Sequence, residues 1–248
     1  MSLPAAIIIA GAIIAIALIW INRPAGTLPS KNSALPQPGS GTGTMSAVTS
    51  EDHIIGNPNA AVKIVEYSDP SCPYCKTFNP IMQRVITEYG PGGSVAWVYR
   101  HFALDKPDEN GDILHPNSGR QARAMECAAA LGGNTAFWAY EKKWYESFPS
   151  DGANRSRTLD DAQIAEVAKS VNLDPVSFND CLASGRFQDR VDQQFTDGIN
   201  AGVSGTPYTI ILTPSGSKIP LPGLTDYATI KKALDIIVSS VTSDSSSK

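Results

Sequence analysis

The chain has 248 residues, of which 42% are hydrophobic and 18% are charged, and its formal net charge is -4. This length supports one substantial hydrophobic core, or one domain with appendages. A mildly acidic chain without a long basic run gives no electrostatic basis for nucleic-acid binding. The chain contains 4 cysteines, too few for a miniature protein that is held together by disulfides.

The N-terminal segment predicts a membrane anchor. The run from Leu3 to Ile21 contains no charged side chain, and roughly 19 apolar residues are enough for a helix to cross the hydrocarbon core of a membrane. A cleaved signal peptide is the alternative, but no Lys or Arg precedes the run and no convincing cleavage site follows it. We therefore expect an uncleaved transmembrane helix over residues 1–22.

Two further segments are expected to lie outside the folded domain. Residues 23–50 are rich in Pro, Gly, Ser and Thr and show no apolar periodicity, which is typical of a flexible linker. Residues 241–248 are rich in Ser and predict a disordered tail. The folded domain is accordingly expected over residues 51–240.

The domain opens with a strand, a helix and a second strand. Alternating β-type residues predict a strand over 62–67. A helix is expected over 73–89, because its apolar residues recur on one face and a run of Gly and Pro follows it. A second strand is expected over 95–102.

A helical block and two more strands complete the domain. We expect helices over 117–131, 137–148, 160–171, 174–184 and 189–200. We expect strands over 207–212 and 218–221, followed by a last helix over 226–239. Helices are thus inserted at about residues 115–200, between the second and third core strands, and this order predicts an α/β fold with a small mixed sheet.

Cys72 and Cys75 form a Cys-x-x-Cys pair where the first helix begins. A helix N-terminus presents free N–H groups and a partial positive charge, and both stabilise a thiolate. We therefore expect Cys72 to be the attacking thiolate and Cys75, about one turn later, to be the resolving thiol. Half of a zinc site is the alternative. Zinc needs four ligands, however, and the other cysteines and the histidines are scattered, so we predict neither a metal nor a cofactor.

Residues 65–75 read Val-Glu-Tyr-Ser-Asp-Pro-Ser-Cys-Pro-Tyr-Cys and resemble the active-site segment of DsbA-like thiol–disulfide oxidoreductases of the thioredoxin-fold superfamily. Further segments fit the same family, and they cover residues 52–58, 99–104, 124–129 with 137–138, and 202–207. The likeness extends over about residues 52 to 240 and is greatest to membrane-anchored or secreted bacterial proteins. It implies a thioredoxin-like fold with a helical insertion.

The resemblance also implies roles for single residues. Glu66 corresponds to a buried acid beneath the cysteine pair, and it is expected to exchange a proton with Cys75 during catalysis. Thr206 and Pro207 resemble the cis-proline element that faces the disulfide and binds substrate. From the residues alone, Glu66 remains compatible with an exposed strand position, and Pro207 with an ordinary turn.

Cys127 and Cys181 lie in two helices of the expected insertion. In an oxidising compartment they are expected to form a structural disulfide, which would stabilise the fold by roughly 4 kcal/mol in the chain-entropy model. Two buried free thiols are the alternative.

The direction of the reaction is less well defined by the sequence than its chemistry. Pro73-Tyr74 matches the glutaredoxin dipeptide, whereas strongly oxidising DsbA proteins carry Pro-His. Tyr74 supplies no cation to a thiolate, so we expect a less oxidising reduction potential than theirs. A protein disulfide oxidoreductase that donates disulfides is nevertheless favoured by the anchor and by the second cysteine pair. A membrane-tethered reductase or isomerase, and a non-enzymatic peptide- or metal-binding module, are the alternatives.

The expected partners follow from this chemistry. They are exported proteins that contain cysteine and, as the resemblance implies, a membrane thiol oxidase that is DsbB-like or vitamin K epoxide reductase-like. Two basic residues after the anchor, Arg23 and Lys31, weakly favour a cytoplasmic domain. The chemistry favours the opposite side, so we expect a single-pass protein of the cell membrane with its catalytic domain outside the cytoplasm.

Overall fold

The computed structural model describes residues 43–147 and 159–245. The predicted transmembrane helix at residues 1–22 and most of the predicted linker lie outside these ranges. Among the helices in the described ranges, none is both long enough and apolar enough to span a membrane.

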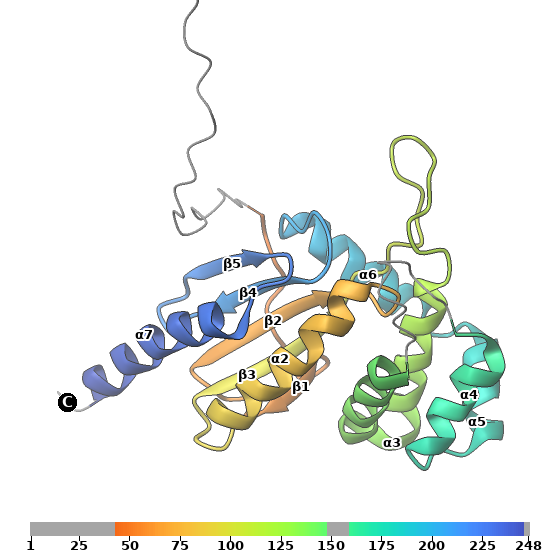
Figure 1. Cartoon of the computed structure of the whole chain (residues 1–248), viewed down its shortest axis with the longest axis horizontal. Coiled ribbons are helices and arrows are strands. Elements are labelled where there is room, and N and C mark those ends of the chain that lie inside the picture. The colour runs from red at the N-terminus through yellow and green to blue at the C-terminus, as the bar shows by residue number, and fades with distance from the viewer. Residues whose placement is uncertain (1–42, 148–158, 246–248) are drawn as a thin grey trace, which may run out of the picture. The chain divides into compact units, whose positions relative to one another are not determined.

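Five strands form one mixed sheet in the described part of the chain (Figure 1). They are β1 His53–Gly56, β2 Val62–Ser68, β3 Val95–His101, β4 Tyr208–Leu212 and β5 Lys218–Pro222. Their order in the sheet is β1-β3-β2-β4-β5. β2 and β3 are parallel, and the other neighbouring pairs are antiparallel. The mixed sheet expected from the sequence is therefore confirmed. β1, for which the sequence analysis predicted no strand, is an edge strand of the sheet.

The described helices match the predicted order closely. They are α2 Pro73–Tyr89, α3 Ser118–Ser147, α4 Asp161–Ser170, α5 Pro175–Ser184, α6 Gln188–Asn200 and α7 Tyr227–Ser245. α7 continues past residue 240, where the sequence predicted the start of a disordered tail. Four of these helices, α3 to α6, lie between β3 and β4 and form the expected insertion.

The two faces of the sheet bury different side chains, because successive residues of a strand point to opposite faces. On β2, Val62 and Ile64 pack in one core together with apolar residues of α2 and α7. Val65 and Tyr67 pack in a second core together with Phe195 of α6. α2 and α7 thus cover one face and α6 covers the other, as Figure 1 shows.

The helical insertion contains a bend within α3 at Gly133. Its φ of 70° lies in the left-handed region that glycine adopts most readily. The bend separates two helical stretches, in agreement with the two helices predicted over 117–131 and 137–148.

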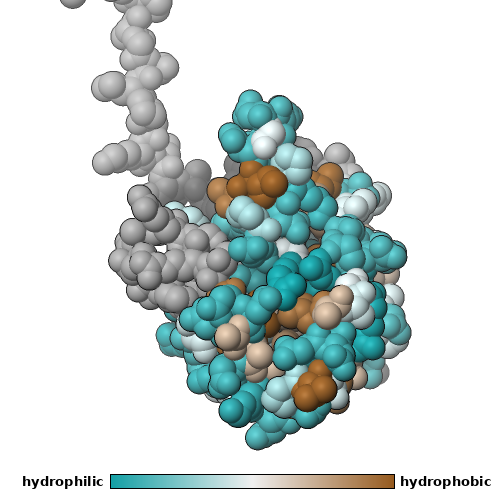
Figure 2. Space-filling model, turned by 90° about the vertical axis from the view of Figure 1, so that its right-hand side faces the viewer, coloured by the Kyte–Doolittle hydropathy of each residue, from teal (hydrophilic) through white to brown (hydrophobic). Residues whose placement is uncertain are grey.

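The surface on the side of the helical insertion is mainly hydrophilic, with scattered apolar side chains (Figure 2).

Short local signals explain where α4 and α5 begin. The Asp160 carboxylate accepts a hydrogen bond from the backbone N–H of Gln163, whose side chain binds back to the backbone of Asp160. At α5, Asp174 is the N-cap and Pro175 occupies the first helical position. These starts are predictable because each depends on residues within one helical turn.

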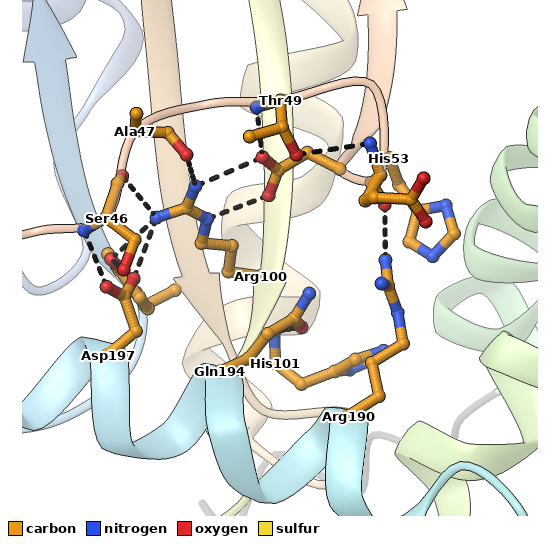
Figure 3. A network of polar contacts seen from close by, with 12 residues as sticks. Ser46, Ala47, Thr49, His53, Arg100, His101, Arg190, Gln194 and Asp197 are labelled. Atoms are coloured by element: carbon orange, nitrogen blue, oxygen red, sulfur yellow. Dashed lines mark hydrogen bonds and ion pairs between the residues drawn. The ribbon is translucent and has the colours of Figure 1, made fainter.

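The chain joins the folded unit earlier than the sequence predicted. Met45 is buried in the core on the α6 face of the sheet. The backbone carbonyls of Ser46 and Ala47 accept hydrogen bonds from Arg100 of β3 (Figure 3). The predicted end of the linker at residue 50 is therefore too late. Composition alone does not reveal that residues 43–50 are fixed by a side chain some fifty positions further along.

Candidate active site

The cysteine pair lies at the start of α2, on the sheet face that this helix covers. Cys72 is the N-cap residue, and Pro73 follows within the first turn. Its missing N–H is no loss there, because the first N–H groups of a helix have no intrahelical partner. Both cysteines are free thiols, and their exposed fractions are 4% for Cys72 and 0% for Cys75.

The two thiols differ strongly in acidity. A hydrogen bond from the Cys75 thiol lowers the pKa of Cys72 to about 6, although burial opposes this shift. Burial raises the pKa of Cys75 well above its ordinary value. At neutral pH the pair therefore presents one thiolate and one thiol, which is the state that thiol–disulfide exchange requires.

The loop before β4 faces the reactive sulfur. The peptide bond between Thr206 and Pro207 is cis, and the Cys72 thiol donates to the backbone carbonyl of Thr206, with 3.4 Å between the sulfur and the oxygen. The hydroxyl of Thr206 is buried and has no partner within the described residues. That hydroxyl is available to donate a hydrogen bond once Cys72 loses its proton.

Glu66 lies on β2 and alternates in phase with Val62 and Ile64, so that its side chain points to the face covered by α2. It is 2% exposed. Burial raises the pKa of Glu66 to about 7, and the negative charge of Cys72 adds to this shift. A carboxyl group that titrates near neutrality beside the cysteine pair is able both to give and to accept a proton.

The cysteines expected to form a structural pair are joined by a disulfide. Cys127 of α3 and Cys181 of α5 are bonded, and their Cα atoms are 5.9 Å apart. This bond holds two helices of the insertion together.

Asp69 is a buried residue of the site that the sequence analysis missed. Its backbone binds both cysteines: its N–H donates to Cys75 Sγ at 3.5 Å, and its carbonyl accepts from the N–H of Cys72 at 3.0 Å. Its carboxylate accepts a hydrogen bond from His115 Nδ1 at 2.9 Å. The sequence analysis included Asp69 only as part of the segment 65–75 and gave it no role, and it treated His115 as one of the scattered histidines.

A second buried acid also lies near this site. Glu141 of α3 is fully buried and accepts a hydrogen bond from Asn79 of α2. Burial raises the pKa of Glu141 well above its ordinary value, and the charge of Glu66 adds to this shift. No short motif contains Glu141, so only the packing of α3 against α2 identifies it.

Two aromatic side chains of α3 hold the loop that precedes Cys72. The indole of Trp144 donates to the carbonyl of Pro70 at 2.8 Å. The hydroxyl of Tyr145 donates to the carbonyl of Asp69 at 3.2 Å. The insertion therefore supports the active-site loop directly as well as packing beside it.

Comparison with known proteins agrees with this geometry. A family model described as Thioredoxin matches residues 48–235. Crystal structures with the same fold include DsbA2 of Pseudomonas aeruginosa, with 25% identity, a TM-score of 0.59 and coverage of 76% of this chain and 96% of that one. They also include the thiol-disulfide exchange protein alpha-DsbA2 of Wolbachia pipientis, with 22% identity, a TM-score of 0.53 and coverage of 73% and 84%. These neighbours agree with the enzyme class expected from the sequence.

A curated relative provides a different kind of match. The Na(+)/H(+) antiporter NhaA 3 of Salinispora tropica is 31% identical over 156 residues, which are 63% of this chain and 21% of the relative. The chain thus spans about a fifth of that relative's length. The family model covers well over half of the chain, and the chain belongs to the thioredoxin family.

Proposed function

We propose that this protein is a protein disulfide oxidoreductase that works through Cys72 and Cys75. The observation that carries the proposal is the asymmetry of the two thiols. Cys72 begins a helix, contacts Thr206 and has a pKa of about 6, whereas Cys75 is fully buried and has a raised pKa. Such a pair separates the attacking group from the resolving group.

The reaction in the oxidising direction has two steps. A substrate thiolate attacks Cys72 Sγ, the bond between Cys72 and Cys75 breaks, and its electron pair passes to Cys75 Sγ. Glu66 supplies the proton that neutralises this thiolate. A second substrate thiolate then attacks the substrate sulfur of the mixed disulfide and releases Cys72 as a thiolate. The substrate dithiol has become a disulfide, and the enzyme disulfide has become a dithiol.

The low pKa of Cys72 supports a disulfide donor. A stabilised thiolate stabilises the reduced enzyme, and this makes the oxidised enzyme more ready to give up its disulfide. The proposed substrates are exported proteins that contain cysteine, and the proposed recycling partner is a DsbB-like or vitamin K epoxide reductase-like membrane oxidase. We place the catalytic domain on the extracytoplasmic side of a membrane, held there by the N-terminal segment.

Serine substitutions test the exchange chemistry. Cys72→Ser is expected to abolish both the reduction of insulin and the oxidative refolding of a reduced substrate. Cys75→Ser is expected to accumulate a mixed disulfide with the substrate, because the resolving thiol is missing. Ser184→Ala, in α5 of the insertion, is a control that should keep full activity. Activity that survives in Cys72→Ser would falsify the proposal.

The direction of exchange is tested by the reduction potential, measured by equilibration with glutathione. A disulfide donor is expected to be clearly more oxidising than thioredoxin, whose potential is about −270 mV. A value near that of thioredoxin would support the reductase instead.

The placement outside the cytoplasm is tested by cysteine labelling. A membrane-impermeant maleimide is expected to label Ser50→Cys in intact cells. Labelling only after lysis would contradict the proposed side of the membrane.

A further inference from the structure

Asp69 and His115 form a buried ion pair next to the two thiols. Asp69 is 0% exposed and His115 is 5% exposed, and Asp69 Oδ2 lies 2.9 Å from His115 Nδ1. The backbone of Asp69 is bonded to Cys72 on one side and to Cys75 on the other. The pair is therefore attached directly to the reactive dithiol.

The position of His115 is fixed from two directions. Its backbone N–H donates to the carbonyl of Leu104 at 2.9 Å, and the N–H of Leu104 donates to Asp69 Oδ2 at 2.8 Å. The other carboxylate oxygen of Asp69 accepts from the N–H of Ser71 at 2.6 Å. The loop between β3 and α3 is thus tied to the active-site loop at the point where the histidine meets the carboxylate.

The charges around Cys72 give this pair a specific effect. The titratable groups that bear on Cys72 are Cys75 of α2, Glu66 of β2, Asp69 in the loop that follows β2, and His115 in the loop before α3. The negative charge of Asp69 raises the pKa of Cys72 and so opposes the thiolate. Burial disfavours the charged form of His115, but the bond to Asp69 and the charges of Asp69 and Cys72 raise the pKa of His115 overall.

We propose that the His115 imidazolium neutralises Asp69 beside the cysteine pair and thereby permits a stable thiolate at Cys72. His115 is a positioning residue in this scheme, because it acts on Cys72 through Asp69. Tyr74, between the two cysteines, supplies no cation, and the positive charge comes from a residue 43 positions after Cys72. The inference rests on the proposed function, since the acidity of Cys72 matters for thiol–disulfide exchange.

Titration of Cys72 in the reduced protein tests the proposal, with thiolate absorbance near 240 nm as the readout. His115→Gln leaves the buried Asp69 carboxylate without its cation, and the half-titration point of Cys72 is expected to rise by about one pH unit. In an Asp69→Asn background, burial is expected to hold His115 in its neutral form, so the same His115→Gln change is expected to have little effect. His53→Gln is the matched control, because it removes a histidine elsewhere in the fold and should leave the titration of Cys72 unchanged.

Two results would overturn the proposal. One is an unchanged Cys72 titration in a folded His115→Gln protein. The other is an equal shift with and without the Asp69→Asn substitution, which would mean that His115 does not act through Asp69. Because the titration reads Cys72 without a substrate, this test is independent of the activity assays of the Cys72→Ser protein.

A second measurement needs no substitution, so it applies even where His115→Gln does not fold. By reciprocity of the coupling, the Cys72 thiolate must raise the pKa of His115. This thiolate exists only in the reduced protein. The NMR titration of His115 is therefore expected to give a higher pKa in the reduced protein than in the oxidised one, and equal values would contradict the proposal.

Discussion

Burial of Glu66 links the stability of the fold to pH. Its pKa is about 7 in the folded protein, compared with 4.5 for an ordinary Glu side chain. Between these values the folded state holds a proton that the unfolded state has released, so stability falls as the pH rises from about 4.5 to 7. Glu66→Gln removes this titration. The variant is expected to be more stable than the parent at pH 8, by up to about 3 kcal/mol, and the difference should shrink at pH 4.5.

Urea unfolding of the reduced protein at the two pH values measures this effect. Glu166→Gln, at an exposed position on α4, is the matched control. Its difference in stability from the parent should be the same at both pH values. If Glu66→Gln differs from the parent by the same amount at both pH values, the pKa of Glu66 is not raised in the folded protein.

Single residues differ in how far the sequence reveals them. Cys72 and Cys75 are predictable because their chemistry depends on a spacing of three positions and on the start of one helix. Asp69 and His115 are separated by 46 positions. Their contact arises only when the loop after β3 folds back onto the loop after β2. Neither local propensity nor periodicity contains that information.

At the scale of elements, Arg100 attaches the segment before β1 to the sheet. Its guanidinium binds the Asp52 carboxylate through Nε and Nη2, at 2.8 and 3.1 Å, and Asp197 of α6 through Nη1 at 2.7 Å. The remaining bonds go to the backbone of Ser46 and Ala47 and to Tyr67. One side chain thus joins three parts of the chain (Figure 3).

Replacing Arg100 is expected to be costly. Arg100→Ala leaves two partly buried carboxylates without a cation; breaking a fully buried pair costs about 3 to 5 kcal/mol, and the loss here is expected to approach the lower end of that range. Denaturant unfolding measures the loss, and limited proteolysis should reveal faster cleavage within residues 43–52. Arg120→Ala, which breaks a surface ion pair with Asp161, is the control and should cost about 1 kcal/mol or less. Equal losses in the two variants would show that Arg100 has no special role.

The disulfide between α3 and α5 is a second link between elements. It closes a loop with a sequence separation of 54 residues, and the chain-entropy model assigns such a loop about 4 kcal/mol. Cys127→Ala with Cys181→Ala is expected to lower stability by an amount of that order. The parent and the Cys127→Ala, Cys181→Ala variant should both carry Cys72→Ser and Cys75→Ser, so that the disulfide between Cys127 and Cys181 is the one difference between them. Equal unfolding midpoints would contradict a stabilising role.

The elements themselves were largely predictable, and the exceptions share a cause. α4 and α5 begin at local capping residues, so their starts follow from a few neighbouring positions. β1 is a short edge strand whose pairing with β3 depends on residues at least forty positions away. Residues 43–50 have the composition of a linker, and they are ordered by Arg100 and by burial of Met45. The missed features are those that nonlocal contacts create.

At the scale of the whole molecule, the thiolate of Cys72 couples folding to the redox state. The pKa of Cys72 is about 6 in the folded protein, compared with 9.0 for an ordinary thiol. Between pH 6 and pH 9 the unfolded state holds a proton that the folded state has released. The contribution of Cys72 to the free energy of unfolding is therefore fully present above pH 9 and is lost as the pH falls through 6. The reduced protein is expected to gain stability over Cys72→Ser between pH 6 and pH 9, by about 3 to 4 kcal/mol.

Urea unfolding of both proteins in the presence of a reductant tests this coupling. The comparison with Cys72→Ser removes the thiol but keeps Glu66, whose own titration runs in the opposite sense over the lower part of the window. A stability difference that is the same at pH 6 and pH 9 would mean that Cys72 is not an acidic thiol in the fold.

The attachment of residues 43–52 to Arg100 also has a mechanical consequence. Tension applied to the chain at residue 43 first meets the buried side chain of Met45 and then the hydrogen bonds of Ser46 to Arg100 near the end of β3 and to Asp197 of α6. The cysteine pair belongs to the core on the opposite face of the sheet. A mechanical load on the chain at residue 43 would therefore be borne by the sheet and by α6. The start of α2, with the cysteine pair, would keep its geometry under that load.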